Sequence, residues 1–169
     1  NLREPDTDAL AAAMVKADRP FTQSGGDLNQ LREDLQTLMW DKAGISRTKE
    51  GLNEAISGLD ALGDELRRTG IADAQKVFNL TWHDWMNLEN QIEVSKTIAR
   101  AALAREDSRG AHFREDFPDT FDLDNSRYTV VGAHADGEMY VDTRPVDFCI
   151  VKPGESLIEG EAGAPPPAS

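Results

Sequence analysis

The stretch that decides the fold of this chain is REDSRGAHFREDFP, residues 105–118. It lies where a long run of helical patterning stops and a turn-rich, acidic segment begins, and it holds the densest cluster of polar side chains in the sequence. We therefore expect a helical scaffold before it and a different kind of structure after it.

Three runs of apolar residues, spaced three and four apart, precede this stretch. Such spacing is typical of helices that bury one narrow stripe. The first run follows Asp27, a suitable N-cap, and we expect it to end near Lys42, with Gly44 in the left-handed conformation. The second run follows Thr48, which can also cap a helix, and continues to Gly70. The three stripes are Leu28, Leu31, Leu35 and Leu38; Leu52, Ala55, Leu59, Leu62 and Leu66; and Trp85, Leu88, Ile92, Ser95, Ala99 and Ala102.

Three stripes joined by short connections predict a mainly α fold, an antiparallel three-helix bundle over residues 27–118 that is spectrin-repeat-like. An alanine-rich patch predicts an extra N-terminal helix from about residue 6 to 18, so that residues 1–26 form this helix and a linker.

The part of the chain after the bundle has strand-forming composition. Residues 119–159 contain two runs rich in strand formers on either side of Asp136-Gly137, a turn dipeptide, which predicts a small C-terminal β-hairpin. A further short strand is expected at residues 147–151. Residues 160–169, GEAGAPPPAS, cannot bury an apolar face and predict a disordered tail.

The charge of the chain argues against two classes of partner. The formal net charge is −13 at pH 7, and residues 115–169 hold twelve acidic and three basic side chains. Nucleic acids and anionic membranes are bound through Lys and Arg, so we expect no nucleic acid partner. No segment approaches the roughly 18 apolar residues of a membrane span, so we expect no direct membrane insertion.

The sequence offers little for catalysis or cofactor binding. Cys149 is the one cysteine, so no internal disulfide can form; a reducing, cytoplasmic setting fits, and its apolar neighbours predict a buried thiol. Scattered histidines give no zinc spacing, and no glycine-rich phosphate-binding fingerprint occurs. We expect no catalytic, cofactor-binding or metal residues here. The chain starts at Asn1 rather than Met, which suggests a processed product or an excised piece.

Residues 105–118 gather four potentially cationic side chains, and two interpretations remain open. In the first, Arg105 and Arg109 share the last helical turn, Gly110 ends the helix, and the arginines pair with Glu106, Glu115 or Asp116. In the second, the same side chains form an anion or interdomain docking site that uses the bidentate fork of arginine.

Four parts of the sequence together carry a resemblance to a known family: AALAREDSRGAH (101–112) with Arg114 and Asp116-Phe117-Pro118, LQTLMWDKAGISRT (35–48), Phe78-Asn79 and Glu89-Asn90. They resemble the C-terminal helical domain of the flavoprotein subunit of succinate dehydrogenase and fumarate reductase; L-aspartate oxidase is similar. Residues 27–118 fit well and the hairpin fits more loosely, with a departure at Asp107, where Glu is usual.

The resemblance implies a parent FAD-dependent oxidoreductase that interconverts succinate and fumarate or oxidises a related acid. The flavin and substrate residues of the family lie in preceding domains, so this chain is expected to be a non-catalytic C-terminal domain that packs on the flavin-binding domain. An iron-sulfur subunit would be a further partner, and would place the parent peripherally at the inner face of the membrane. The interdomain docking candidates are Arg105, Ser108, Arg109, His112 and Arg114.

A second hypothesis comes from a different class of protein. The chain would be a freestanding acidic three-helix interaction module, whose hairpin and tail contact a basic partner. This hypothesis accounts for the uneven charge and for the lack of catalytic constellations.

Overall fold

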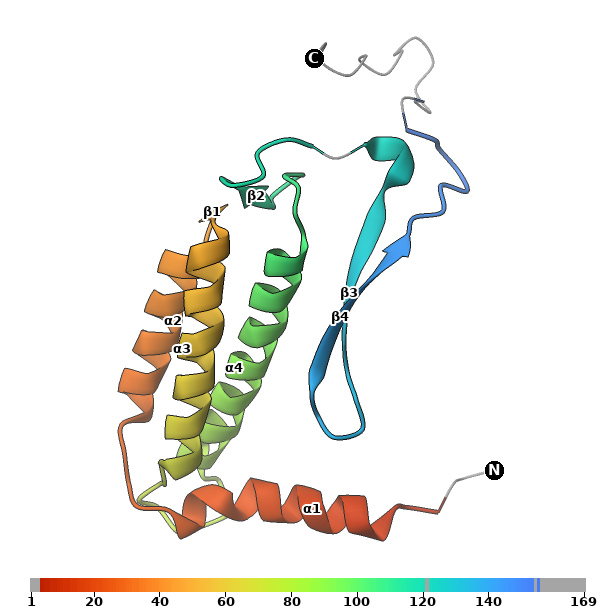
Figure 1. Cartoon of the computed structure of the whole chain (residues 1–169). Helices are drawn as coiled ribbons and strands as arrows, with labels where there is room; N and C mark the ends of the chain where they lie inside the picture. Colours follow the sequence, from red (N-terminus) through yellow and green to blue (C-terminus); the bar gives the residue numbers. More distant parts are fainter. Residues whose placement is uncertain (1–3, 121, 154, 156–169) are drawn as a thin grey trace.

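The computed structural model describes residues 4–120, 122–153 and 155. Figure 1 shows the long helices side by side, with a shorter helix across one end of them and a hairpin beside the last. In chain order the elements are α1 (Thr7–Asp18), η1 (Arg19–Thr22), α2 (Leu28–Ala43), β1 (Ser46–Arg47), α3 (Lys49–Arg68), α4 (Leu80–Ala104), β2 (Phe113–Arg114), η2 (Leu123–Asn125), β3 (Arg127–Ala133) and β4 (Met139–Pro145). The mainly helical class and the C-terminal antiparallel hairpin are confirmed.

Each long helix begins at a polar side chain that bonds the free backbone N–H groups of its first turn. Asp27 caps α2 and Thr48 caps α3, as their positions in the sequence predict, and Asn79 caps α4 in the same way. Such caps satisfy donors that have no partner inside the helix, so the starts of the three helices are fixed locally.

The predicted stripes of α2, α3 and α4 face one another and form the core. At its centre Trp85 is fully buried, and its Nε1 donates to the carbonyl oxygens of Leu66 and Thr69, at 3.2 and 2.9 Å. The polar atom of this large side chain is therefore satisfied at the end of α3. The buried members of the core are Leu28, Leu31, Leu35, Ala55, Leu59, Leu66, Ile71, Trp85, Leu88, Ile92 and Ala99.

Helix α1 differs from the other helices because none of its residues is buried. Its C-terminal end is attached to α4 and to the segment before α4 by polar contacts: Trp82 Nε1 donates to the Ala17 carbonyl at 2.8 Å, and Lys76 Nζ lies 2.7 Å from Asp18 Oδ1. The remainder of α1 projects away from α2–α4 (Figure 1).

The end of α2 differs from the prediction. Gly44 has φ −69° and ψ −139°, so the expected left-handed conformation is wrong. A Cβ atom at this position would lie 2.4 Å from the carbonyl oxygen of Trp40. Glycine is required here because the chain passes close to the preceding turn of the helix, and not because φ is positive.

The hairpin pairs β3 with β4 in antiparallel register from Arg127↔Pro145 to Ala133↔Met139, and Gly137 takes φ +90° in its loop. The strand predicted at 147–151 is absent from the described residues there, and Cys149 is exposed, so the prediction of a buried thiol is wrong. Pro145 and Pro153 bracket this segment and cannot donate to a ladder. The predicted disordered tail, 160–169, lies outside the described residues.

Candidate functional site

Arg114 stands at the centre of the segment 105–118. Its side chain is fully buried, and Nη1 donates to the carbonyl oxygens of Ala102, Leu103 and Arg105 at 2.9, 3.1 and 3.0 Å. The carbonyls at the C-terminal end of a helix have no partner inside it and carry the negative end of its dipole. Arg114 therefore caps α4.

This cap changes the expected position of the helix end. Because α4 stops at Ala104, Arg105 and Arg109 do not share a last helical turn, and that prediction is wrong. Gly110, with φ +59°, does not end the helix either; it lies in a tight turn that two backbone hydrogen bonds close between Arg109 and His112, at 2.7 and 3.0 Å. A guanidinium from downstream satisfies the carbonyls for which a glycine cap was expected.

Asp116 accepts the remaining hydrogen bonds of the Arg114 guanidinium. Arg114 Nε donates to Asp116 Oδ1 at 2.7 Å and Nη2 donates to Oδ2 at 2.8 Å, while Oδ2 also accepts the backbone N–H of Lys49 at 2.9 Å. The hydrogen bonds from Arg114 hold the pKa of Asp116 well below its usual range, and the N–H of Lys49 lowers it further. Since Lys49 is the first residue of α3, the pair joins the end of α4 to the start of α3.

Ser108 organises the loop that carries this pair. Its hydroxyl accepts the backbone N–H of Arg114 at 2.9 Å and donates to the carbonyl oxygen of Phe117 at 2.7 Å. Its own backbone N–H bonds the Asp119 carbonyl at 3.0 Å. Ser108 is only 6% exposed, so its polar groups serve the loop itself.

His112 is hydrogen-bonded to Arg47, a residue that was not among the docking candidates. Arg47 Nε donates to the carbonyl oxygens of Ala43 and Gly44, at 3.2 and 2.8 Å, so Arg47 caps α2 as Arg114 caps α4. Arg47 Nη1 lies 2.9 Å from His112 Nδ1. A guanidinium can only donate, so we assign Nδ1 as the acceptor and place the ring proton on Nε2, which lies 3.4 Å from the Arg105 carbonyl.

This environment favours the neutral imidazole. Burial lowers the pKa of His112 below its ordinary value; the bond to the Arg105 carbonyl opposes this, and the charge of Arg47 adds to the lowering. A short parallel ladder, in which β1 pairs with β2, holds Arg47 and His112 together. The sequence signal for Arg47 was its place shortly after Gly44, in the segment 35–48 that carries part of the family resemblance.

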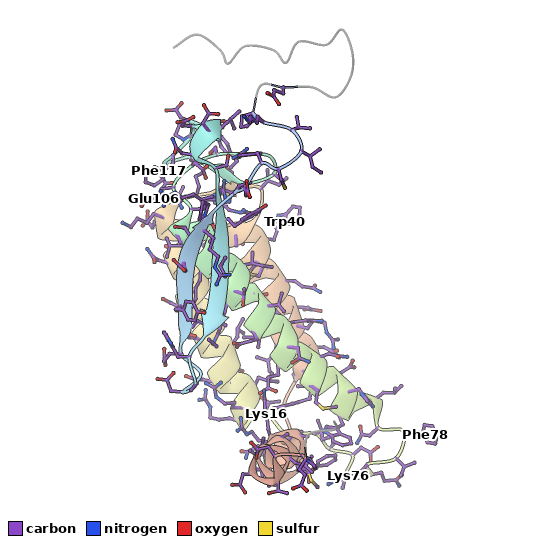
Figure 2. The ribbon with its side chains drawn as sticks, turned by 90° about the vertical axis from the view of Figure 1, so that its right-hand side faces the viewer. Lys16, Trp40, Lys76, Phe78, Glu106 and Phe117 are labelled. Atoms are coloured by element: carbon purple, nitrogen blue, oxygen red, sulfur yellow. The ribbon has the colours of Figure 1, made fainter. Side chains whose placement is uncertain are left out.

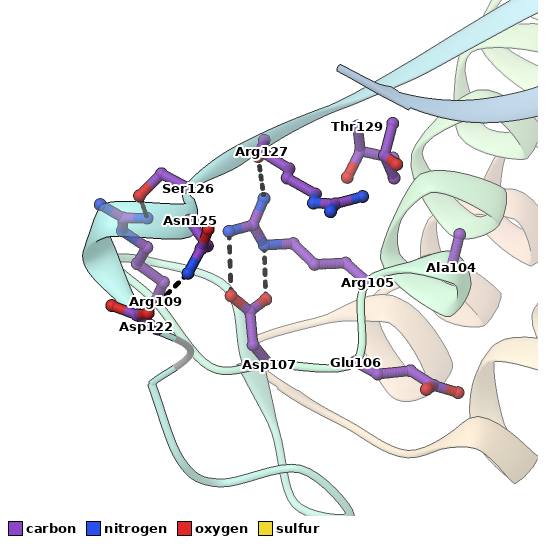
Figure 3. Close-up of a pocket in the computed structure, with 11 residues that line it drawn as sticks. Ala104, Arg105, Glu106, Asp107, Arg109, Asp122, Asn125, Ser126, Arg127 and Thr129 are labelled. Carbon is purple, nitrogen blue, oxygen red and sulfur yellow. Dashed lines mark hydrogen bonds and ion pairs between the residues drawn. The ribbon is translucent and has the colours of Figure 1, made fainter. Parts of the chain in front are cut away.

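Arg105 and Arg109 face a separate cavity of about 260 Å³ between the end of α4 and the start of the hairpin (Figure 3). Arg105 forms a two-pronged pair with Asp107, at 2.7 and 3.1 Å, and its Nη1 donates to the Arg127 carbonyl at 3.3 Å. Arg109 Nη1 donates to Ser126 Oγ at 2.7 Å. The structure thus divides the five candidates: Ser108, His112 and Arg114 lie inside the turn, and Arg105 and Arg109 line the cavity.

Among the residues that the structure describes, no group of three or more His, Cys, Asp or Glu side chains converges on a point where a metal ion could bind. No helix within residues 4–120, 122–153 and 155 combines the length and apolar character needed to cross a membrane.

Comparison with known proteins gives consistent results. Residues 32–157 match the family described as fumarate reductase flavoprotein C-term. The chain is 41% identical over 100 residues to an uncharacterized FAD-dependent oxidoreductase of Methanocaldococcus jannaschii, covering 56% of this chain and 17% of that protein. It is 32% identical to the fumarate reductase flavoprotein subunit of Mycobacterium tuberculosis, over 80% of this chain and 23% of that protein.

A solved structure of a fumarate reductase is also similar to this chain. A chain of Escherichia coli quinol fumarate reductase superposes with a TM-score of 0.80 and 28% identity, covering 96% of this chain and 28% of that chain. In these three comparisons the chain spans between 17% and 28% of the length of the protein it matches.

The first prediction concerns Arg114. Arg114→Met should lower the free energy of unfolding by about 3 kcal/mol, because buried carbonyl oxygens of α4 lose their donor. Urea unfolding followed by circular dichroism measures this. Arg67→Met is the matched control: Arg67 also pairs with a neighbouring acid, Asp64, but in solvent, and its loss should cost no more than about 0.5 kcal/mol. Equal effects of the two substitutions would contradict the capping role.

The second prediction concerns pH. The folded state holds the pKa of His112 below the unfolded value of about 6.5, so the unfolded chain binds the proton first and stability falls as pH drops below that value. His112→Asn keeps an acceptor for Arg47 but does not titrate. The urea midpoint of unfolding should therefore decrease less from pH 7.5 to pH 5 in this variant than in the wild type. An equal decrease in both proteins would rule out a contribution from His112.

Proposed function

The chain belongs to the fumarate reductase flavoprotein C-terminal family, and from this premise we propose that it is the C-terminal domain of an FAD-dependent oxidoreductase resembling succinate dehydrogenase and fumarate reductase. Its role is to pack on the flavin-binding domain of the same parent chain rather than to carry out the chemistry. The family match over residues 32–157, which contains the whole turn at 105–118, carries this proposal.

The described residues do not fit a flavin dinucleotide. Dinucleotide sites are built where a parallel strand meets a helix through a glycine-rich turn. In the described part of the chain the parallel pairing is limited to β1 with β2, which is two residues long, and a single bridge between Gly25 and Gly70; the β1–α3 connection holds no such turn. We therefore place FAD in the flavin-binding domain of the parent, and derive no reaction step from this chain.

Within this proposal the five candidate residues have two roles. Arg105 and Arg109 are proposed to dock on acidic or carbonyl groups of the flavin-binding domain, since both are only partly buried and line an open cavity. Ser108, His112 and Arg114 organise the segment that presents them. Arginine suits such contacts because its planar fork can hold two acceptors at once.

The finer organisation is part of the same proposal. We divide the chain into an N-terminal helix with its linker (1–26), a spectrin-repeat-like antiparallel three-helix bundle (27–118), a hairpin extension (119–159) and a tail (160–169). An iron-sulfur subunit is proposed as a further partner of the parent, in line with the multi-subunit relatives, and would hold it peripherally at the inner face of a membrane. The freestanding acidic module remains the alternative, favoured by the excess of acids after residue 115.

The third prediction tests where the flavin binds. The purified 169-residue chain should show no flavin absorbance near 450 nm after incubation with FAD, while the complete flavoprotein encoded by the longer gene should carry FAD. Stoichiometric FAD on the chain alone would overturn the proposed position of the cofactor. A longer gene without an upstream dinucleotide fingerprint would favour the freestanding module.

The fourth prediction concerns Arg109. Arg109→Ala should leave the chain folded, since it removes one side-chain bond worth about 1 kcal/mol. In the complete flavoprotein it should weaken domain packing by about 2–5 kcal/mol, the usual effect of removing one member of a desolvated charged contact. Thermal unfolding and activity of both proteins test this, with the exposed Arg67→Ala as control. An unchanged complete flavoprotein would argue against docking through Arg109.

A further inference from the structure

Phe78 is presented to solvent in an unusual way. Its side chain is 97% exposed, and its backbone has φ +55°, the left-handed region that bulky residues rarely adopt. Figure 2 shows it projecting sideways from the turn between α3 and α4, at the end of the molecule opposite Glu106 and Phe117. The chain thus places a large apolar side chain in water, in an unfavourable backbone conformation.

The neighbouring residue holds this conformation in place. Asn79 is 3% exposed; its Nδ2 donates to the carbonyl oxygens of Asp73 and Gln75 at 2.9 and 2.7 Å, and its Oδ1 accepts the backbone N–H of Trp82 at 2.8 Å. These bonds tie the turn before Phe78 to the first turn of α4. Phe78 therefore lies in a turn that is held by several hydrogen bonds, and its backbone is preorganised for a contact.

More apolar side chains are exposed at the same end of the bundle. Val77 and Leu80 flank Phe78, at 71% and 77% exposure. Helix α1, attached to this turn through the pair between Asp18 and Lys76, has no buried residue. We call the six exposed apolar side chains the apolar end surface: Leu10, Met14, Val15, Val77, Phe78 and Leu80. Exposed apolar side chains that gather at one end of a molecule indicate a contact with another protein surface.

We propose that the apolar end surface docks on the flavin-binding domain of the parent chain, with Phe78 inserted into an apolar pocket of that domain. This inference rests on the proposed function, and adds a second contact at the end of the bundle opposite residues 105–118. The matched E. coli chain is much longer than this one, which covers 28% of it, and the family is the C-terminal part of the flavoprotein.

The path of the chain favours this occupant over a separate subunit. In a longer parent, the preceding domain connects to the bundle through α1, which carries half of the apolar end surface. Lys16 of α1 and Phe78 lie at the same end of the molecule (Figure 2). A covalent connection of this kind keeps the domain at a high effective concentration next to the surface. A separate iron-sulfur subunit has no such connection.

The fifth prediction tests the contact by hydroxyl-radical footprinting with mass spectrometry. Oxidation of Phe78 should be about 10-fold slower in the flavoprotein without other subunits than in the 169-residue chain, because a residue inserted in a pocket is shielded from water. Phe113, in the turn at 105–118, reports separately on the proposed function. Protection of Phe113 alone would overturn the Phe78 contact and leave the proposed function standing, whereas protection of neither would overturn both.

Two other outcomes would also overturn the proposed occupant. Protection that appears only after an iron-sulfur subunit is added would assign the surface to that subunit. Protection in the 169-residue chain that grows with its concentration would assign the surface to a second copy of this chain.

A substitution at Phe78 tests the same contact independently of footprinting. Phe78→Asn should raise the thermal midpoint of the 169-residue chain by about 2–4 °C, since asparagine tolerates positive φ and no packing is lost. In the complete flavoprotein the same change should lower the midpoint. Ile150 is 82% exposed and lies outside this surface. Ile150→Asn is therefore the control, and it should leave the thermal midpoint of both proteins unchanged. An unchanged or raised midpoint of the flavoprotein with Phe78→Asn would overturn the inference.

Discussion

The ion pair between Arg114 and Asp116 is the interaction on which the rest of this structure depends. The end of α4 and the start of α3 lie at the same end of the bundle, so the negative end of one helix dipole stands beside the positive end of the other. The guanidinium faces the carbonyls of α4 and the carboxylate faces the N–H of Lys49. Each charge of the pair therefore meets the helix end that favours it, and one buried side chain fixes two helices.

The features that the sequence predicted are those set by local chemistry. The stripes through Leu59 and Trp85 follow from helical periodicity, the caps at Asp27 and Thr48 from side chains next to free N–H groups, and the hairpin from Asp136-Gly137. In each case the deciding atoms lie within a few residues of one another, so the outcome does not depend on the rest of the fold.

The features that were missed depend on distant residues. The end of α4 was misplaced because its cap, Arg114, comes from ten residues downstream and replaces the expected glycine. Arg47 was missed because its partner His112 is 65 positions away. Gly44 is required by the proximity of the Trp40 carbonyl, which no pattern of φ preferences reveals. The separate positions of the candidate residues, three inside the turn and two at the cavity, therefore required the tertiary structure.

The pairing of β1 with β2 has a consequence for the order of folding. Residues so far apart in sequence can meet only after the intervening helices have brought their ends together, since closing a long loop costs entropy that local contacts must first offset. The turn at 105–118 is thus expected to be among the last parts of the chain to form. Until it forms, Arg105 and Arg109 are not held in position, so a nascent or misfolded chain would lack the ordered surface that we propose for domain docking.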